Sequence, residues 1–178
     1  MKKLLAILLT AAMLCSFVSI GALAESKEAI NPVKEFPFSM TPSELLAKAE
    51  ALGLHIIDPY DDPEYEPWAE NPVRDGRRDD SYGHFWYEYE EGIMFFFSEG
   101  ETFQSMSIIG RDMFETPKGV RVGDCMLKVI RKHGICVAVF GAIFQKKTKE
   151  GYLFIIPNLT RGTVYAWGIS EKRLVHDD

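Results

Sequence analysis

The chain has 178 residues and a formal net charge of −6 at pH 7, with 26 acidic and 20 basic side chains. An acidic surface of this kind is a poor partner for nucleic acid. Only three cysteines are present, far fewer than a small disulfide-stapled scaffold needs.

The amino-terminal region predicts a cleavable signal peptide over residues 1–24. Two lysines precede an uncharged apolar run from Leu4 to Ala24, and Ala22 and Ala24 are the small residues that a signal peptidase reads. The run is just long enough to span a bilayer, so an uncleaved anchor is the alternative. Cleavage removes two positive charges and changes the net charge from −6 to −8. We expect residues 25–178 to be a single secreted domain without a membrane span, extracellular or loosely surface-associated.

The first helix is predicted over residues 41–53. Thr41 and Glu44 have the spacing of a capping box, and Pro42 suits the first helical position. Gly53 is the expected left-handed terminator. Apolar residues recur at three- and four-residue spacing, as a helix with one buried face requires: Leu45, Leu46, Ala49 and Leu52.

A second helix is predicted over residues 124–134 by the same kind of pattern. Asp124 is the expected cap and Gly134 the expected stop. The predicted apolar stripe consists of Met126, Leu127, Val129 and Ile130.

Each predicted helix is followed by three strand patterns separated by glycine-containing turns, which is typical of an antiparallel meander. The predicted strands are 85–90, 93–98 and 102–109 after the first helix, and 137–145, 152–156 and 163–170 after the second.

This repeated order predicts a tandem duplication. The first copy, about 36–110, is longer than the second, about 117–170, and the excess corresponds to an acidic insertion at 58–83 without helix or strand periodicity. The predicted fold class is α+β: two repeats of a helix plus a three-stranded antiparallel meander, with both helices packed on one face of the sheet.

The segment Thr116-x-x-Gly119-Val120-x-Val122-Gly123-Asp124, followed by Val129 and Gly134, resembles the helix-entry motif of secreted proteins with a β-lactamase-inhibitor-protein-like fold. Small envelope lipoproteins of the SmpA/OmlA type are similar. The match covers about twenty residues. The resemblance implies tandem units of helix and antiparallel sheet, and it implies no activity.

No catalytic, metal or cofactor signature is present. The four histidines lack the spacing of a helical metal pair. Cys125 and His133 lie eight residues apart on one predicted helix, too far for a nucleophile and its base, so His133 is expected to face the last helix carbonyls. After signal cleavage, Cys125 and Cys136 are the only possible disulfide pair. A continuous helix would hold them too far apart, and two buried thiols are favoured over a bridge.

The acidic insertion contains three aromatic residues, Tyr60, Tyr65 and Trp68, that are candidates for partner binding. The alternative is that they pack on the sheet edge and hold the insertion in place. The acidic residues lack the ligand spacing of an EF-hand loop, which favours a solvated or partner-contacting loop over a calcium site.

Three further aromatic residues, Trp86, Tyr165 and Trp167, are expected either in the core or on an exposed sheet face that stacks against a ligand. In the last strand, Tyr165 and Trp167 are expected on the same side.

These features predict a secreted, non-enzymatic binding protein without a cofactor. It would present an exposed sheet face and the acidic aromatic loop to a protein or cell-envelope partner. One alternative is a small extracellular hydrolase whose site assembles from distant residues such as His84, Asp124 and the loop acids. Another is a structural or envelope-assembly protein.

Overall fold

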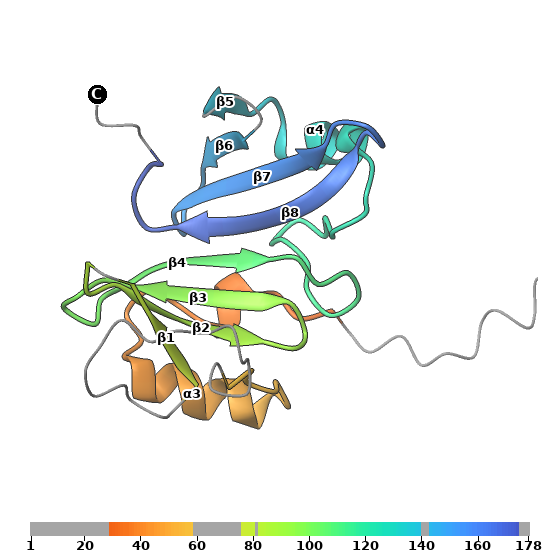
Figure 1. The fold of residues 1–178 in the computed structure, drawn as a ribbon. Helices are drawn as coiled ribbons and strands as arrows, with labels where there is room; N and C mark the ends of the chain where they lie inside the picture. Colours follow the sequence, from red (N-terminus) through yellow and green to blue (C-terminus); the bar gives the residue numbers. More distant parts are fainter. Residues whose placement is uncertain (1–28, 59–75, 81, 140–142, 175–178) are drawn as a thin grey trace, which may run out of the picture.

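A computed structural model of the chain describes residues 29–58, 76–80, 82–139 and 143–174, and these form an α+β fold around an antiparallel sheet (Figure 1). The predicted signal peptide lies outside the described residues. Within those ranges no helix has both the length and the apolar character that crossing a membrane requires. The helices are α2 (Pro32–Glu35), α3 (Pro42–Ala51) and α4 (Met126–His133). The strands are β1 (Arg77–Asp79), β2 (Phe85–Tyr89), β3 (Ile93–Phe97), β4 (Phe103–Ile108), β5 (Val137–Val139), β6 (Ile143–Lys147), β7 (Tyr152–Asn158) and β8 (Thr163–Ser170).

The described strands form one sheet in the order β1-β2-β3-β4-β8-β7-β6-β5, with every neighbouring pair antiparallel. Four consecutive strands follow α3, and four more follow α4. The two groups meet where β4 pairs with β8, from Ser105 opposite Ser170 to Ile108 opposite Trp167. We call this contact the seam, and Figure 1 shows one group of strands on either side of it.

α3 forms as the sequence predicts, because its first turn satisfies its own backbone donors. The Thr41 hydroxyl accepts the Glu44 backbone N–H, and the Glu44 carboxylate accepts the Thr41 N–H at 2.9 Å. The Thr41 backbone N–H and the Thr41 hydroxyl both donate to the Glu44 carboxylate, and these hydrogen bonds lower the pKa of Glu44. Leu45 and Ala49 are fully buried, and Gly53 ends the segment with φ at 71°.

The core lies between the helices and one face of the sheet. Burial alternates strictly along β2 and β3, as expected when one strand face is covered. The covered face of these strands carries Phe85, Tyr87, Tyr89, Ile93, Phe95 and Phe97. Across the seam the same buried cluster continues through Met106, Ile108, Leu153, Ile155, Trp167 and Ile169.

Two strand predictions are wrong. Residues 137–145 were expected to be one strand, but β5 and β6 pair antiparallel there as separate strands. The insertion 58–83 was expected to contain no strand, yet Arg77–Asp79 pairs with β2 as β1. The Arg77 guanidinium lies 3.8 Å from the centre of the Phe85 ring, so cation–π attraction holds this charged strand on an aromatic surface.

Candidate functional site

The predicted binding residues do not converge on one surface. Tyr60, Tyr65 and Trp68 lie outside the described residues. Trp86 is half-buried on the sheet face opposite the core, where its ring stacks on Phe96 with centroids 6.3 Å apart. That face is not open throughout, because beyond the seam Phe154, Ala166 and Gly168 on the same side are buried.

Tyr165 and Trp167 were expected on the same side of their strand, and this is wrong. Ile156 pairs with Ala166 and Pro157 pairs with Val164, so Tyr165 is an extra residue in a β-bulge. The bulge shifts the alternation of side chains. Trp167 is therefore fully buried, whereas Tyr165 is 59% exposed.

The approach to α4 is held by backbone hydrogen bonds to β8. Gly123 donates to the Val164 carbonyl and Val164 donates to the Asp124 carbonyl, both at 2.8 Å. Met126 donates to the Gly162 carbonyl at 3.0 Å. The start of α4 is thus fixed to the start of β8.

Asp124 was expected to cap α4, but Cys125 is the cap residue and its side chain makes no capping hydrogen bond. The Asp124 carboxylate accepts the Arg121 backbone N–H and the Lys128 ammonium, each at 2.7 Å. Burial raises the pKa of Asp124, but these two hydrogen bonds outweigh it, so the pKa lies below the ordinary value. Asp124 therefore organises the turn before the helix.

His133 does not face the last helix carbonyls as expected. Its ring is buried, and Nε2 lies 2.9 Å from the Thr116 hydroxyl. Burial, together with the nearby Lys118 and Lys146 ammonium groups, lowers the pKa of His133 to about 4. Lys146 donates to the His133 carbonyl instead. The contact between Thr116 and His133 thus joins the end of α4 to the loop that precedes the helix.

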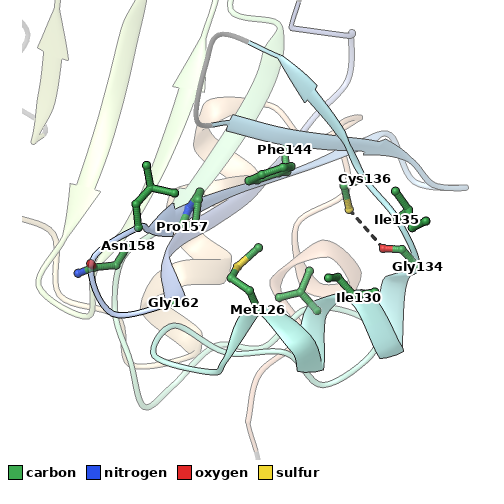
Figure 2. Close-up of a pocket in the computed structure, with 11 residues that line it drawn as sticks. Met126, Ile130, Gly134, Ile135, Cys136, Phe144, Pro157, Asn158 and Gly162 are labelled. Atoms are coloured by element: carbon green, nitrogen blue, oxygen red, sulfur yellow. Dashed lines mark hydrogen bonds between the residues drawn. The ribbon is translucent and has the colours of Figure 1, made fainter.

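An apolar cavity of about 300 Å³ lies between α4 and strands β6 and β7. Figure 2 shows Met126 and Ile130 of α4 on one side of it and Phe144 and Pro157 across from them. Its volume is at the small end of the range for ligand pockets. The remaining lining residues are Val129, Gly134, Ile135, Cys136, Asn158, Leu159 and Gly162.

Several large aliphatic side chains at this cavity are exposed to solvent. Ile130 is 50% exposed, Ile135 86% and Leu159 75%, and all three line the cavity. Leu127, on the helix turn before Ile130, is 76% exposed. We call these four residues the α4 surface. Large contiguous patches of exposed apolar surface are a feature of interaction sites in soluble proteins.

The α4 surface contradicts the prediction that Leu127 and Ile130 belong to a buried stripe. Only Val129 and His133 of α4 are buried. Of the four residues in the predicted stripe, Val129 is buried and Met126 is partly buried against the core. Ile135 and Leu159 were not predicted as site residues, although Leu159 stands as a lone aliphatic residue in the turn-forming run Pro157–Gly162, which was a usable signal.

Charge is distributed unevenly along the chain. Residues 25–110 contain 19 acidic and 6 basic side chains, for a net charge of −13, whereas residues 111–178 contain 7 acidic and 12 basic side chains, for +5. Arg131, Lys132 and Arg161 are exposed beside the α4 surface. Beyond the end of α4, a second hollow of about 360 Å³ is lined by Lys118, Lys146, Lys147 and Lys149.

Both cysteines in the described ranges are free, so no bridge links them. The expectation of two buried thiols is wrong for Cys125, which is exposed at the start of α4. Cys136 is half-buried in the cavity wall, and burial raises the pKa of its thiol.

His84 and Asp124, which the hydrolase alternative names, each contact a different partner, and most of the loop acids lie outside the described residues. His84 contacts Asp80 at 3.0 Å, but this acid is its neighbour in a turn and the His84 side chain is 50% exposed. His55 contacts Glu91 at 2.6 Å and is 71% exposed. Asp124 is occupied by the hydrogen bonds described above. Across the described ranges, no group of three or more metal-binding side chains is present.

Comparisons with known proteins leave the family open. No family model matches the chain, and no curated protein matches it. Among solved structures, it is similar to an extracellular protein containing an SCP domain from Bacillus anthracis, with 11% sequence identity and a TM-score of 0.49. The match covers 83% of this chain and 48% of that protein, so the chain spans about half the length of its structural neighbour. A likeness this weak carries no argument about function.

Proposed function

We propose that this chain is a secreted, non-enzymatic binding protein and that the α4 surface is its binding site. The partner is a protein or a component of the cell envelope. The signal peptide predicted over residues 1–24 supports secretion. The observation that carries the proposal is the apolar cavity whose lining includes three solvent-exposed aliphatic side chains: Ile130, Ile135 and Leu159.

Burial of these side chains by a partner supplies the driving force for binding. Removing a large aliphatic side chain from water contributes about 1.5–3 kcal/mol. The same exposure has no role in the stability of the free protein, because none of the three belongs to its buried core.

The repeated element order supports a tandem duplication as the origin of the scaffold. Each unit would consist of a helix followed by four antiparallel strands, one more than the sequence predicted, with the units joined at the seam. The resemblance of Thr116–Asp124 to the inhibitor-like and SmpA/OmlA-type motif fits such a unit. In this proposal the first unit supplies stability and the second supplies the binding surface.

A capture experiment tests the proposed site. Residues 25–178, which contain every described element, are immobilised and exposed to the envelope and secreted fractions of the source organism. We expect the double variant Ile135→Asp/Leu159→Asp to lose components that the wild-type protein retains. Tyr82→Asp is the matched control, because Tyr82 is 78% exposed in the other half of the molecule. Identical retention by all three proteins would contradict the proposal.

The candidate residues of the acidic loop are tested in the same experiment. A triple variant that replaces Tyr60, Tyr65 and Trp68 by alanine keeps the α4 surface intact. Loss of the same components in this variant would show that the loop contributes to binding. Full retention would place binding on the α4 surface alone.

A further inference from the structure

We propose that the occupant of the α4 surface is the face of an anionic lipid bilayer, to which the protein binds peripherally. This inference rests on the proposed function and names the partner class of the same site. Two observations carry it: the protrusion of the aliphatic side chains, and the unpaired cations beside them.

The aliphatic side chains of the α4 surface are largely exposed to solvent, including the three that line the cavity. Leu127, Ile135 and Leu159 are each at least 75% exposed. Leu127 lies on α4, Ile135 lies two residues after the end of α4, and Leu159 lies in the β7–β8 turn. Short elements that present aliphatic tips together are suited to shallow insertion at the boundary between headgroups and acyl chains. The neighbouring apolar cavity provides additional space for the end of an acyl chain.

The cations beside these side chains are available for an anionic surface. Arg131 and Lys132 follow Leu127 and Ile130 on α4, and Arg161 lies two residues after Leu159 in its turn. None of these three cations forms an ion pair with any residue that the structure describes. By contrast, Lys128 is paired with Asp124 at 2.7 Å. Each lysine or arginine near an anionic membrane contributes about 1 kcal/mol of attraction.

The charge distribution of the whole chain determines how the protein is oriented on the membrane. The basic half, with a net charge of +5, carries the α4 surface, and the acidic half carries −13. An anionic bilayer attracts the former and repels the latter. The protein therefore binds with residues 111–178 toward the lipid and residues 25–110 directed away from it.

The α4 surface is also rigidly presented. The backbone hydrogen bonds from Gly123 and Met126 to β8 fix the start of the helix relative to the turn that carries Leu159. Arg161 donates its backbone N–H to the Asn158 side chain at 3.1 Å, which holds that turn. Because the surface is formed before contact, binding does not require a segment to fold.

Vesicle flotation tests the inference directly. Residues 25–178 are mixed with vesicles of phosphatidylglycerol and phosphatidylcholine, or of phosphatidylcholine alone. We expect flotation only with the anionic vesicles and a decrease as salt is raised, since screening weakens the attraction. Each cation removed should lower the partition coefficient about fivefold, so the double variant Arg131→Gln/Lys132→Gln should lower it roughly 25-fold.

Two further variants separate the apolar and electrostatic contributions. Ile135→Ser/Leu159→Ser should lower partitioning by about tenfold or more, because less apolar surface enters the bilayer. Lys172→Gln/Arg173→Gln removes the same charge at the other end of β8 and should leave partitioning nearly unchanged. All of these side chains are exposed, so the variants should fold normally.

The outcomes distinguish this inference from the proposed function. Absence of flotation with anionic vesicles, or equal loss in the Lys172→Gln/Arg173→Gln control, would overturn the bilayer inference. Binding of soluble polyglutamate that depends on Arg131 and Lys132, without flotation, would overturn it in favour of an acidic polypeptide. In either case, loss of captured components in Ile135→Asp/Leu159→Asp would still support the α4 surface as a binding site.

Discussion

α3 and α4 each precede four consecutive antiparallel strands, but they bury their apolar residues to different extents. In α3, Leu45 and Ala49 are fully buried, and the helix begins with a complete capping box. In α4, Leu127 is 76% and Ile130 50% exposed, and the cap residue makes no side-chain hydrogen bond. Stability alone accounts for the residues of α3. The residues of α4 require a second explanation, and in the proposed function burial of these residues by a binding partner is that explanation.

The comparison extends to the strands that follow each helix. The covered faces of β2 and β3 carry only apolar and aromatic side chains, and the Phe36 ring lies 4.6 Å from Phe95 over them. Next to α4, the cavity occupies the corresponding place between helix and strands. The first half of the molecule is therefore the more completely packed. Substitutions at buried and at exposed positions test this difference between the two halves.

The largest effect is expected at Trp167, a predicted binding residue that the structure places in the core. Trp167→Ala should lower the free energy of unfolding by about 3–5 kcal/mol, because it leaves a large cavity beside the seam. Trp167→Phe should cost much less, since the buried indole N–H has no partner among the described residues. Urea unfolding measures both changes.

Tyr165→Ala is the matched control and should change the free energy of unfolding by less than about 0.5 kcal/mol. Equal losses of stability in Trp167→Ala and Tyr165→Ala would refute the bulge assignment.

The next largest effect is expected at Gly168, which pairs with Ser107 across the seam. A Cβ atom there would overlap the Met106 carbonyl oxygen across the seam and the Phe154 ring. Gly168→Ala should therefore cost about 3 kcal/mol, because backbone and a packed ring must both move. Gly162 has φ at 64° and no atom close to its Cβ position, so Gly162→Ala should cost only about 1 kcal/mol. Chemical denaturation of both variants checks the order, and a smaller cost at Gly168 would show that the seam is loosely packed.

A pH dependence of intermediate size is expected from His133, which lies in the second half of the molecule. Its folded pKa of about 4 lies below the ordinary histidine value of 6.5, so the unfolded chain binds more protons between these values. Stability should be complete above pH 6.5 and fall as the pH decreases toward 4. With solvent screening of Lys118 and Lys146 taken into account, the loss is about 2 kcal/mol.

Urea titrations between pH 4.5 and 7.5 measure this loss. His133→Gln removes the titrating ring and should abolish most of the dependence in that window. Asp124 does not interfere, because its pKa lies below 3.8 and its contribution is lost only at lower pH. A wild-type protein with flat stability over this window would show that the ring is solvated.

Local sequence patterns predicted the parts of the fold that local physics determines. Thr41, Glu44 and Gly53 specify α3 within a single segment, and the alternation of β2 specifies its buried face. The division of this segment into β5 and β6 was missed because residues 137–145 read as one apolar run interrupted by a single glycine. β1 was missed because its stability depends on the Phe85 ring of another strand, which no local pattern reveals.

The candidate site was the least predictable feature, for a related reason. Helical spacing showed that Leu127 and Ile130 share a face, but exposure depends on whether a distant element covers that face. Tyr165 and Trp167 were separated by a bulge that arises from pairing with β7. The α4 surface combines residues from a helix, its end and a remote turn, and only the folded chain brings them together.

The smallest expected effect concerns the two helix caps. Thr41→Ala should lower the free energy of unfolding by about 1 kcal/mol, because the Glu44 N–H loses its acceptor. Cys125→Ser should instead raise it by several tenths of a kcal/mol, since a serine hydroxyl provides the cap acceptor that α4 lacks. Cys125 is exposed, so no packing is lost. Thermal unfolding under reducing conditions measures both changes.

Stabilisation by Cys125→Ser with unaltered vesicle flotation would show that α4 is only marginally stable and that its exposed residues serve binding. Destabilisation would show that the thiol has a structural role and that the two helices differ less than their caps indicate.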